Sequence, residues 1–220
     1  MFRAVIFDMD GVLIDSEPFW RQAHITALKR RGHIVTEDEI RALAGTRTAD
    51  VVRHWKERFD LPDVTGQELA DEIIQTVIRN ITQKGAALPG ALQTLKLFAR
   101  HGMPMAIASG STPNVIDAVV ERLELKAHLQ FTYSAVNEPK GKPDPGVFLT
   151  SAKKLGVAPV DCIVFEDAVY GVRAAKAAGM KCVAIPELAN RDKPEFKDAD
   201  LLIDSLEELS WEQLVNLYSD

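Results

Sequence analysis

The sequence predicts an α/β protein with a doubly wound parallel sheet and an inserted all-α helical cap domain. From residue 88 onward, short apolar runs alternate with segments of helical periodicity, which is typical of right-handed βαβ units. Between residues 15 and 84 only helical periodicity occurs. We therefore expect a Rossmann-like core formed by residues 1–14 and 85–220, and a cap formed by residues 15–84.

The first predicted strand, residues 4–7, is apolar and leads directly into Asp8-Met9-Asp10-Gly11. Residues two apart in an extended segment point to the same side, so Asp8 and Asp10 can face one site. Two carboxylates this close repel each other, unless a divalent cation binds or one carboxyl keeps its proton and serves as an acid. The alternative is that the pair only ends a strand, because Asp and Gly are common turn residues.

The cap is predicted to be a small helical bundle. Apolar residues recur every four positions in two of its stretches, as expected for amphipathic helices. Thr36 with Glu39, and Thr65 with Glu68, have the spacing of capping boxes. Both pairs therefore predict helix starts.

The rest of the core should supply five further strands, predicted at residues 103–108, 131–135, 162–165, 181–185 and 201–203. In doubly wound sheets the ligand site lies outside the carboxyl ends of the strands. Polar residues cluster at these ends: Ser109 and Gly110, then Lys142, then Glu166 and Asp167. These positions are candidates for one site shared with Asp8 and Asp10.

The segments 4–16, 106–111, 141–145 and 164–168 together resemble the four motifs of the haloacid dehalogenase superfamily. Their order and spacing match over residues 2 to about 205. The similarity is greatest to the branch with a helical cap after the first motif, which includes β-phosphoglucomutase and 2-deoxyglucose-6-phosphate or hexitol phosphatases. The resemblance implies phosphoryl-transfer chemistry, and Asp10 distinguishes this chain from dehalogenases, which lack that carboxylate.

The resemblance implies a role for each motif residue. Asp8 would be the nucleophile that forms an aspartyl phosphate, and Asp10 the general acid and base. Phosphate contacts would come from Met9, Ser109, Gly110 and Lys142. Mg²⁺ would be held by Asp8, the backbone carbonyl of Asp10, Glu166 and Asp167, since oxygen ligands suit this cation. Ala168 stands where a serine is common, which puts one supporting hydrogen bond in doubt.

Substrate choice is expected to depend on the cap. The candidates are Glu17, Trp20 and Arg47, although Trp20 can equally be cap core and an exposed Arg47 is the ordinary alternative. β-Phosphoglucomutases carry a histidine near position 20 and a lysine near position 44, where this chain has Trp20 and Ala44. We therefore expect a Mg²⁺-dependent phosphatase of small phosphorylated sugars or sugar alcohols. The alternatives are a phosphosugar mutase, a non-enzymatic phosphate-binding regulator, and a narrower phosphatase for glycolate or glycerol phosphates.

The amino-acid composition limits the classes of binding partner that we expect. A net charge of -6 disfavours nucleic acid and anionic membranes as partners, and no apolar run reaches the ~18 to 20 residues of a membrane span. The amino terminus resembles neither a signal nor a transit peptide. Cys162 and Cys182 are expected to be buried free thiols. We expect a cytoplasmic monomer whose partner is a small-molecule phosphosugar.

Overall fold

The computed structural model describes residues 1–219, and the side chains of all of these except residues 63 and 64. Its sheet has six parallel strands in the order β3-β2-β1-β4-β5-β6. The strands are β1 (Ala4–Phe7), β2 (Met105–Ser109), β3 (Phe131–Ser134), β4 (Cys162–Glu166), β5 (Lys181–Ala184) and β6 (Leu201–Leu202). The predicted α/β fold is confirmed.

Helices cover both faces of the sheet because side chains alternate along its central strand. Val5 and Phe7 belong to the core cluster shared with α5 (Ala91–Arg100), α6 (Pro113–Arg122) and α9 (Trp211–Asn216). Ala4 and Ile6 belong to the cluster shared with α7 (Gly146–Leu155) and α8 (Val169–Ala177). Both faces of the sheet are therefore covered by helices and buried, as is usual for parallel sheets.

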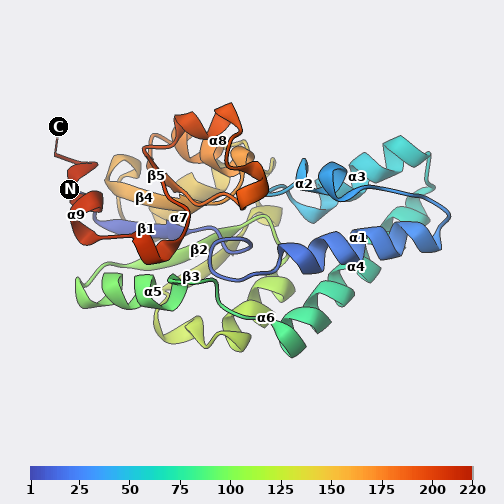
Figure 1. Cartoon of the computed structure of the whole chain (residues 1–220), viewed down its shortest axis with the longest axis horizontal. Helices are drawn as coiled ribbons and strands as arrows, with labels where there is room; N and C mark the ends of the chain where they lie inside the picture. The colour runs from blue at the N-terminus through green and yellow to red at the C-terminus, as the bar shows by residue number, and fades with distance from the viewer. Residues whose placement is uncertain (220) are drawn as a thin grey trace.

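Residues 15–84, which we call the cap segment, contain α1 (Glu17–Arg30), α2 (Glu37–Arg41), α3 (Thr48–Phe59) and α4 (Asp63–Lys84). Figure 1 shows these helices extending to the side of the sheet away from both termini. Ile14 pairs with Ala87 in an antiparallel bridge, so the two connections to the core lie side by side. The boundaries at 14/15 and 84/85 stay a prediction.

The interior of the cap segment follows the predicted apolar stripes. Leu69, Ile73, Val77 and Ile81 on α4 are all fully buried, and α4 packs against α1 and α3. These four residues lie on one face because they recur every four positions.

The two predicted capping boxes have different outcomes. Thr36 Oγ1 accepts from the Glu39 amide at 3.3 Å, and Glu39 Oε2 accepts from the Thr36 amide at 2.8 Å, so the first is confirmed. The second is wrong, because α4 begins at Asp63 and Thr65 lies inside its first turn. Pro62 precedes that helix, and proline suits a helix start because of its fixed φ.

The connections contain short 3-10 helices at Leu125–Ala127, Ala135–Asn137, Pro159–Asp161, Leu188–Asn190, Pro194–Asp198 and Leu206–Glu208. Cys162 and Cys182 are buried and unpaired, which confirms the prediction of free thiols. Of the helices described, none combines the length and the apolar character that a membrane crossing needs. The cytoplasmic location and the monomeric state stay predictions.

Candidate active site

Three adjacent strand ends form the floor of the candidate site. Central strand β1 pairs with β2 on one side and with β4 on the other. The chain runs outward in opposite directions from this point, which is where doubly wound sheets bind ligands. Asp8 follows β1 directly, and its amide donates to the Phe165 carbonyl at 2.8 Å. Ser109 ends β2 and Glu166 ends β4, so parallel pairing brings these three residues to one edge.

Lys142 inserts its side chain between two of these strand ends. The ammonium donates to Asp8 Oδ1, and to Glu166 Oε1 at 2.5 Å. Its side chain is 0% exposed. Although burial opposes the charged form, the carboxylates of Asp8 and Glu166 raise the pKa of Lys142 above its ordinary value. Lys142 is therefore a fixed buried cation beside Asp8.

The acidic groups at this edge outnumber that cation. One ligand oxygen from each of Asp8, Glu166 and Asp167 lies within 4.8 Å of the other two, and all three residues are buried. Burial raises the pKa of Asp8 to about 8, although Lys142 opposes the shift. Burial, with the charge of Glu166, also raises the pKa of Asp167. Such a cluster is short of positive charge, so these residues fit a hard divalent cation.

The fourth predicted ligand, Asp10, contributes no side-chain oxygen to this cluster, and metal binding by its backbone carbonyl stays a prediction. Glu166 Oε2 also accepts from the amides of Asp167 and Ala168, at 3.0 and 3.1 Å. With Lys142 on its other oxygen, Glu166 orients the loop that carries Asp167. Because both Glu166 oxygens already accept hydrogen bonds, Asp8 and Asp167 have more oxygen atoms available to bind a metal than Glu166 has.

Gly11→Ala should weaken Mg²⁺ binding at least about 10-fold, since supporting groups of metal sites typically contribute about 10- to 100-fold. Gly11 has φ +75°, and a Cβ there would overlap the carboxylate of Asp167. Gly179→Ala is the matched control, because Gly179 has φ +74° and open space around it. Calorimetric titration with Mg²⁺ measures the difference. Equal affinities in the two variants would show that the Asp167 carboxylate does not hold the ion.

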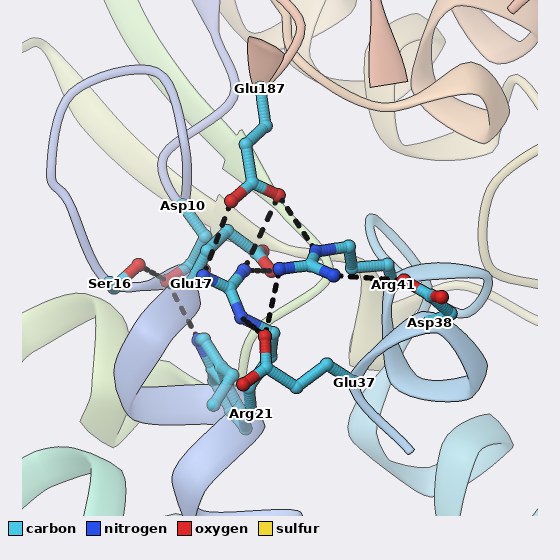
Figure 2. Close-up of polar contacts among 9 residues, drawn as sticks. Asp10, Ser16, Glu17, Arg21, Glu37, Asp38, Arg41 and Glu187 are labelled. Carbon is cyan, nitrogen blue, oxygen red and sulfur yellow. Dashed lines mark hydrogen bonds and ion pairs between the residues drawn. The ribbon is translucent and has the colours of Figure 1, made fainter. Parts of the chain in front are cut away.

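Asp10 turns its carboxylate away from the cluster and is held by three donors. Oδ1 accepts from Ser16 Oγ at 2.5 Å and from Trp20 Nε1 at 2.9 Å, while Oδ2 accepts from Ser111 Oγ at 2.7 Å. Figure 2 shows Asp10 and Ser16 beside the start of α1. Trp20 thus contacts a predicted catalytic residue, and sequence reasoning missed the roles of Ser16 and Ser111. Both are hydroxyl residues within the motif segments, which was the available signal.

A pocket of about 60 Å³ lies between the cap segment and the strand ends. Six of the predicted site residues line this pocket: Asp8, Asp10, Glu17, Trp20, Ser109 and Gly110. Burial, with the charge of Asp10, raises the pKa of Glu17 to about 7. His24, Thr46, Thr48 and Ser111 also line the pocket, and sequence reasoning did not select them as substrate-binding residues.

Three predicted binding residues do not line this pocket: Met9, Arg47, and Lys142, which contacts Asp8. The Met9 side chain is fully buried in the core, so only its backbone can contact a phosphate. Arg47 donates to Asp50 Oδ2 at 2.6 Å and to the Glu138 carbonyl at 2.9 Å. Arg47 therefore joins the cap segment to a core loop and does not line the pocket, although its neighbours Thr46 and Thr48 do.

A second contact between cap segment and core is an ion-pair cluster around Glu187, which follows β5 (Figure 2). Arg21 Nη2 lies 3.2 Å from Glu187 Oε1, and Arg41 Nε lies 3.4 Å from Oε2. Glu37 contacts both arginines, at 3.6 and 2.8 Å. This cluster holds α1 and α2 over the strand ends, and no local sequence pattern indicated it.

Comparisons with known proteins identify the family of this chain. A family profile described as haloacid dehalogenase-like hydrolase matches residues 2–179. Hexitol phosphatase B of Escherichia coli strain K12 is 34% identical over 213 residues, which is 96% of each chain. Fructose-1-phosphate phosphatase of the same strain is 32% identical over 187 residues, covering 84% of this chain and 96% of the relative.

Among solved structures, β-phosphoglucomutase from Clostridium difficile superposes with a TM-score of 0.85 and 26% identity. The match covers 99% of this chain and 97% of that one. The predicted superfamily, its branch, and an enzyme of the phosphoric monoester hydrolase class are confirmed by these matches. The chain belongs to the haloacid dehalogenase-like hydrolase family.

Proposed function

We propose that this protein is a Mg²⁺-dependent phosphatase of small phosphorylated sugars or sugar alcohols that acts through an aspartyl phosphate. The observation that carries the proposal is the arrangement of two carboxylates on one pocket. Asp8 lies against Lys142 and the acidic cluster, while Asp10 is held away from them by Ser16, Trp20 and Ser111. In this proposal one carboxylate attacks and the other exchanges a proton with the leaving oxygen.

In the first step, an Asp8 oxygen attacks phosphorus and the bond from phosphorus to the alcohol oxygen breaks. Asp10 gives its proton to that oxygen, so the product leaves as a neutral alcohol. Lys142, the Ser109 hydroxyl and the Gly110 amide would offset the charge on the phosphoryl oxygens. The transfer leaves a phosphoryl group on Asp8 and a carboxylate on Asp10.

In the second step, the Asp10 carboxylate takes a proton from water as the water attacks phosphorus. The bond between phosphorus and the Asp8 oxygen breaks, which releases phosphate and restores both aspartates. Asp8, Glu166, Asp167 and the Asp10 carbonyl would hold Mg²⁺, which supplies positive charge to the phosphoryl oxygens. The cap segment excludes bulk water during the first step.

A phosphosugar mutase is the second candidate, and the likeness to β-phosphoglucomutase favours it. A mutase must hold a second phosphate group in the cap. The described residues that line the pocket include no lysine or arginine, and Trp20 and Ala44 lie in it. This lining favours hydrolysis. The third alternative, a non-enzymatic regulator, has no support from the named phosphatase relatives.

We expect the purified protein to release phosphate from hexose and hexitol phosphates in Mg²⁺, and to lose at least about 100-fold of this rate in excess EDTA. A panel of hexose, pentose, hexitol and short-chain phosphates ranks the substrates. Conversion of β-glucose 1-phosphate into the 6-phosphate without phosphate release would identify a mutase. No reaction with any of these esters would contradict the proposed function.

A further inference from the structure

His24 lines the pocket, and the mechanism above does not use it. It lies on α1 with its side chain buried, 3% of the residue being exposed. Trp20 and His24 lie three and seven residues after Glu17, so the three side chains share one helical face. All three line the same pocket. The rings of His24 and Trp20 lie nearly parallel, with centroids 6.3 Å apart.

The tautomer of His24 follows from its neighbour in α3. Trp55 Nε1 donates a hydrogen bond to His24 Nδ1 at 3.3 Å. An indole nitrogen can only donate, so Nδ1 must be the unprotonated nitrogen. Burial lowers the pKa of His24 to about 4, which leaves the ring neutral near pH 7. The proton of the neutral ring is therefore on Nε2.

The Nε2–H group has no hydrogen-bond partner among the described residues. In that part of the chain, Arg41 Nε is the single fully covered side-chain polar atom without a hydrogen bond. His24 Nε2 therefore keeps accessible surface, and the pocket that the ring lines is where that surface lies. A donor in so enclosed a place is stabilised by an acceptor oxygen from a ligand.

The charged groups of the pocket indicate which kind of ligand oxygen would accept from His24 Nε2–H. The charged groups among its described lining residues are the carboxylates of Asp8, Asp10 and Glu17. A second phosphate or a carboxylate on the substrate would meet no lysine or arginine among the lining residues that the structure describes, and ionisation of Glu17 adds repulsion. A hydroxyl is different, because it can accept from His24 and donate to Glu17 at once.

We propose that His24 Nε2–H donates to a hydroxyl oxygen of the substrate, while the Glu17 carboxylate accepts from a hydroxyl. The catalytic consequence rests on the proposed function, whereas the binding contact does not. The pocket would then select phosphate monoesters of neutral polyols over bisphosphates and over phosphorylated acids. His24 is a specificity-determining residue in this scheme.

The test measures binding without turnover, in an Asp8→Asn background with Mg²⁺, by calorimetry. The two probes are glucitol 6-phosphate and inorganic phosphate. His24→Phe should weaken the binding of glucitol 6-phosphate at least about 10-fold, because the polyol contacts position 24. The affinity for inorganic phosphate should change less than about 2-fold, because phosphate does not reach that position. His24→Gln, which keeps an N–H donor, should recover part of the loss. His54→Phe, an exposed histidine on α3, is the matched control and should bind both probes normally.

Three outcomes would overturn the inference. Equal weakening of both probes in His24→Phe would mean a structural role, and unchanged glucitol 6-phosphate binding would mean that no contact is made. The proposed function can fail while the binding contact stands. In that case the wild-type protein would release no phosphate from a polyol ester, although binding of that ester would still depend on His24. Glucitol 6-phosphate that binds no more tightly than inorganic phosphate also overturns the hydroxyl contact.

Discussion

Asp8→Asn should lower phosphate release from the best sugar phosphate by at least about 10⁴-fold, because the amide cannot serve as the nucleophile. The substitution keeps the shape of the side chain and an oxygen that can accept from Lys142. We therefore expect the free energy of unfolding to change by less than about 1 kcal/mol. Steady-state kinetics and urea unfolding on the same preparation measure both quantities.

The matched control for this variant is Asp117→Asn, an exposed residue on α6 that does not line the pocket. It makes the same chemical change and should leave turnover within about 2-fold of wild type. Near-normal turnover by Asp8→Asn would refute the aspartyl phosphate. Acid quench of the wild-type reaction with a ³²P-labelled substrate should in addition trap label on the protein.

Lys142→Met should cost about 3 to 5 kcal/mol of folding stability, together with a loss of activity of at least about 10³-fold. The ammonium is fully buried between Asp8 and Glu166, so its removal leaves two acidic groups without their cation. Burial already raises the pKa of Asp8 in the folded protein, and the variant loses the Lys142 charge that opposes this shift. The lost stability should therefore be smallest below about pH 4, where Asp8 is protonated in both the folded and the unfolded chain, and it should grow as the pH rises above that value.

Lys176→Met provides the control, since Lys176 is paired with Asp200 at 2.5 Å but its side chain is 35% exposed. Exposed ion pairs contribute about 0 to 1 kcal/mol, and Lys181 also contacts Asp200. Urea unfolding at pH 4 and pH 8 compares the two variants. Similar losses for both, with no dependence on pH, would mean that Lys142 does not compensate the buried carboxylates.

The cap segment is held over the strand ends by contacts that lie outside the pocket. Arg47 reaches the Glu138 carbonyl, and Arg21 and Arg41 share Glu187 (Figure 2). Trp20 extends from the same segment to Asp10. Docking of the cap segment therefore does two things: it encloses the pocket, and it completes the set of donors that orients the predicted general acid.

The fold and the motif residues were predictable from sequence for a local reason. Each motif follows a strand or opens a helix, and the parallel pairing of β2, β1 and β4 brings their carboxyl ends to one edge. Once the strands are recognised, Ser109, Asp8 and Glu166 must be neighbours. The wrong helix start at Thr65 was local as well, because a capping-box spacing also occurs inside a first turn.

What only the tertiary structure decided is how the cap segment meets the core. Arg21 and Glu187 are 166 residues apart, and no periodicity or turn pattern relates them. Arg47 was a candidate for substrate binding, yet docking of the cap segment brings its side chain to the Glu138 carbonyl of the core. The proton position on His24 likewise depends on Trp55 in another helix. Strand pairing is dictated by local pattern, whereas docked surfaces and the tautomers they select depend on contacts that form only in the folded chain.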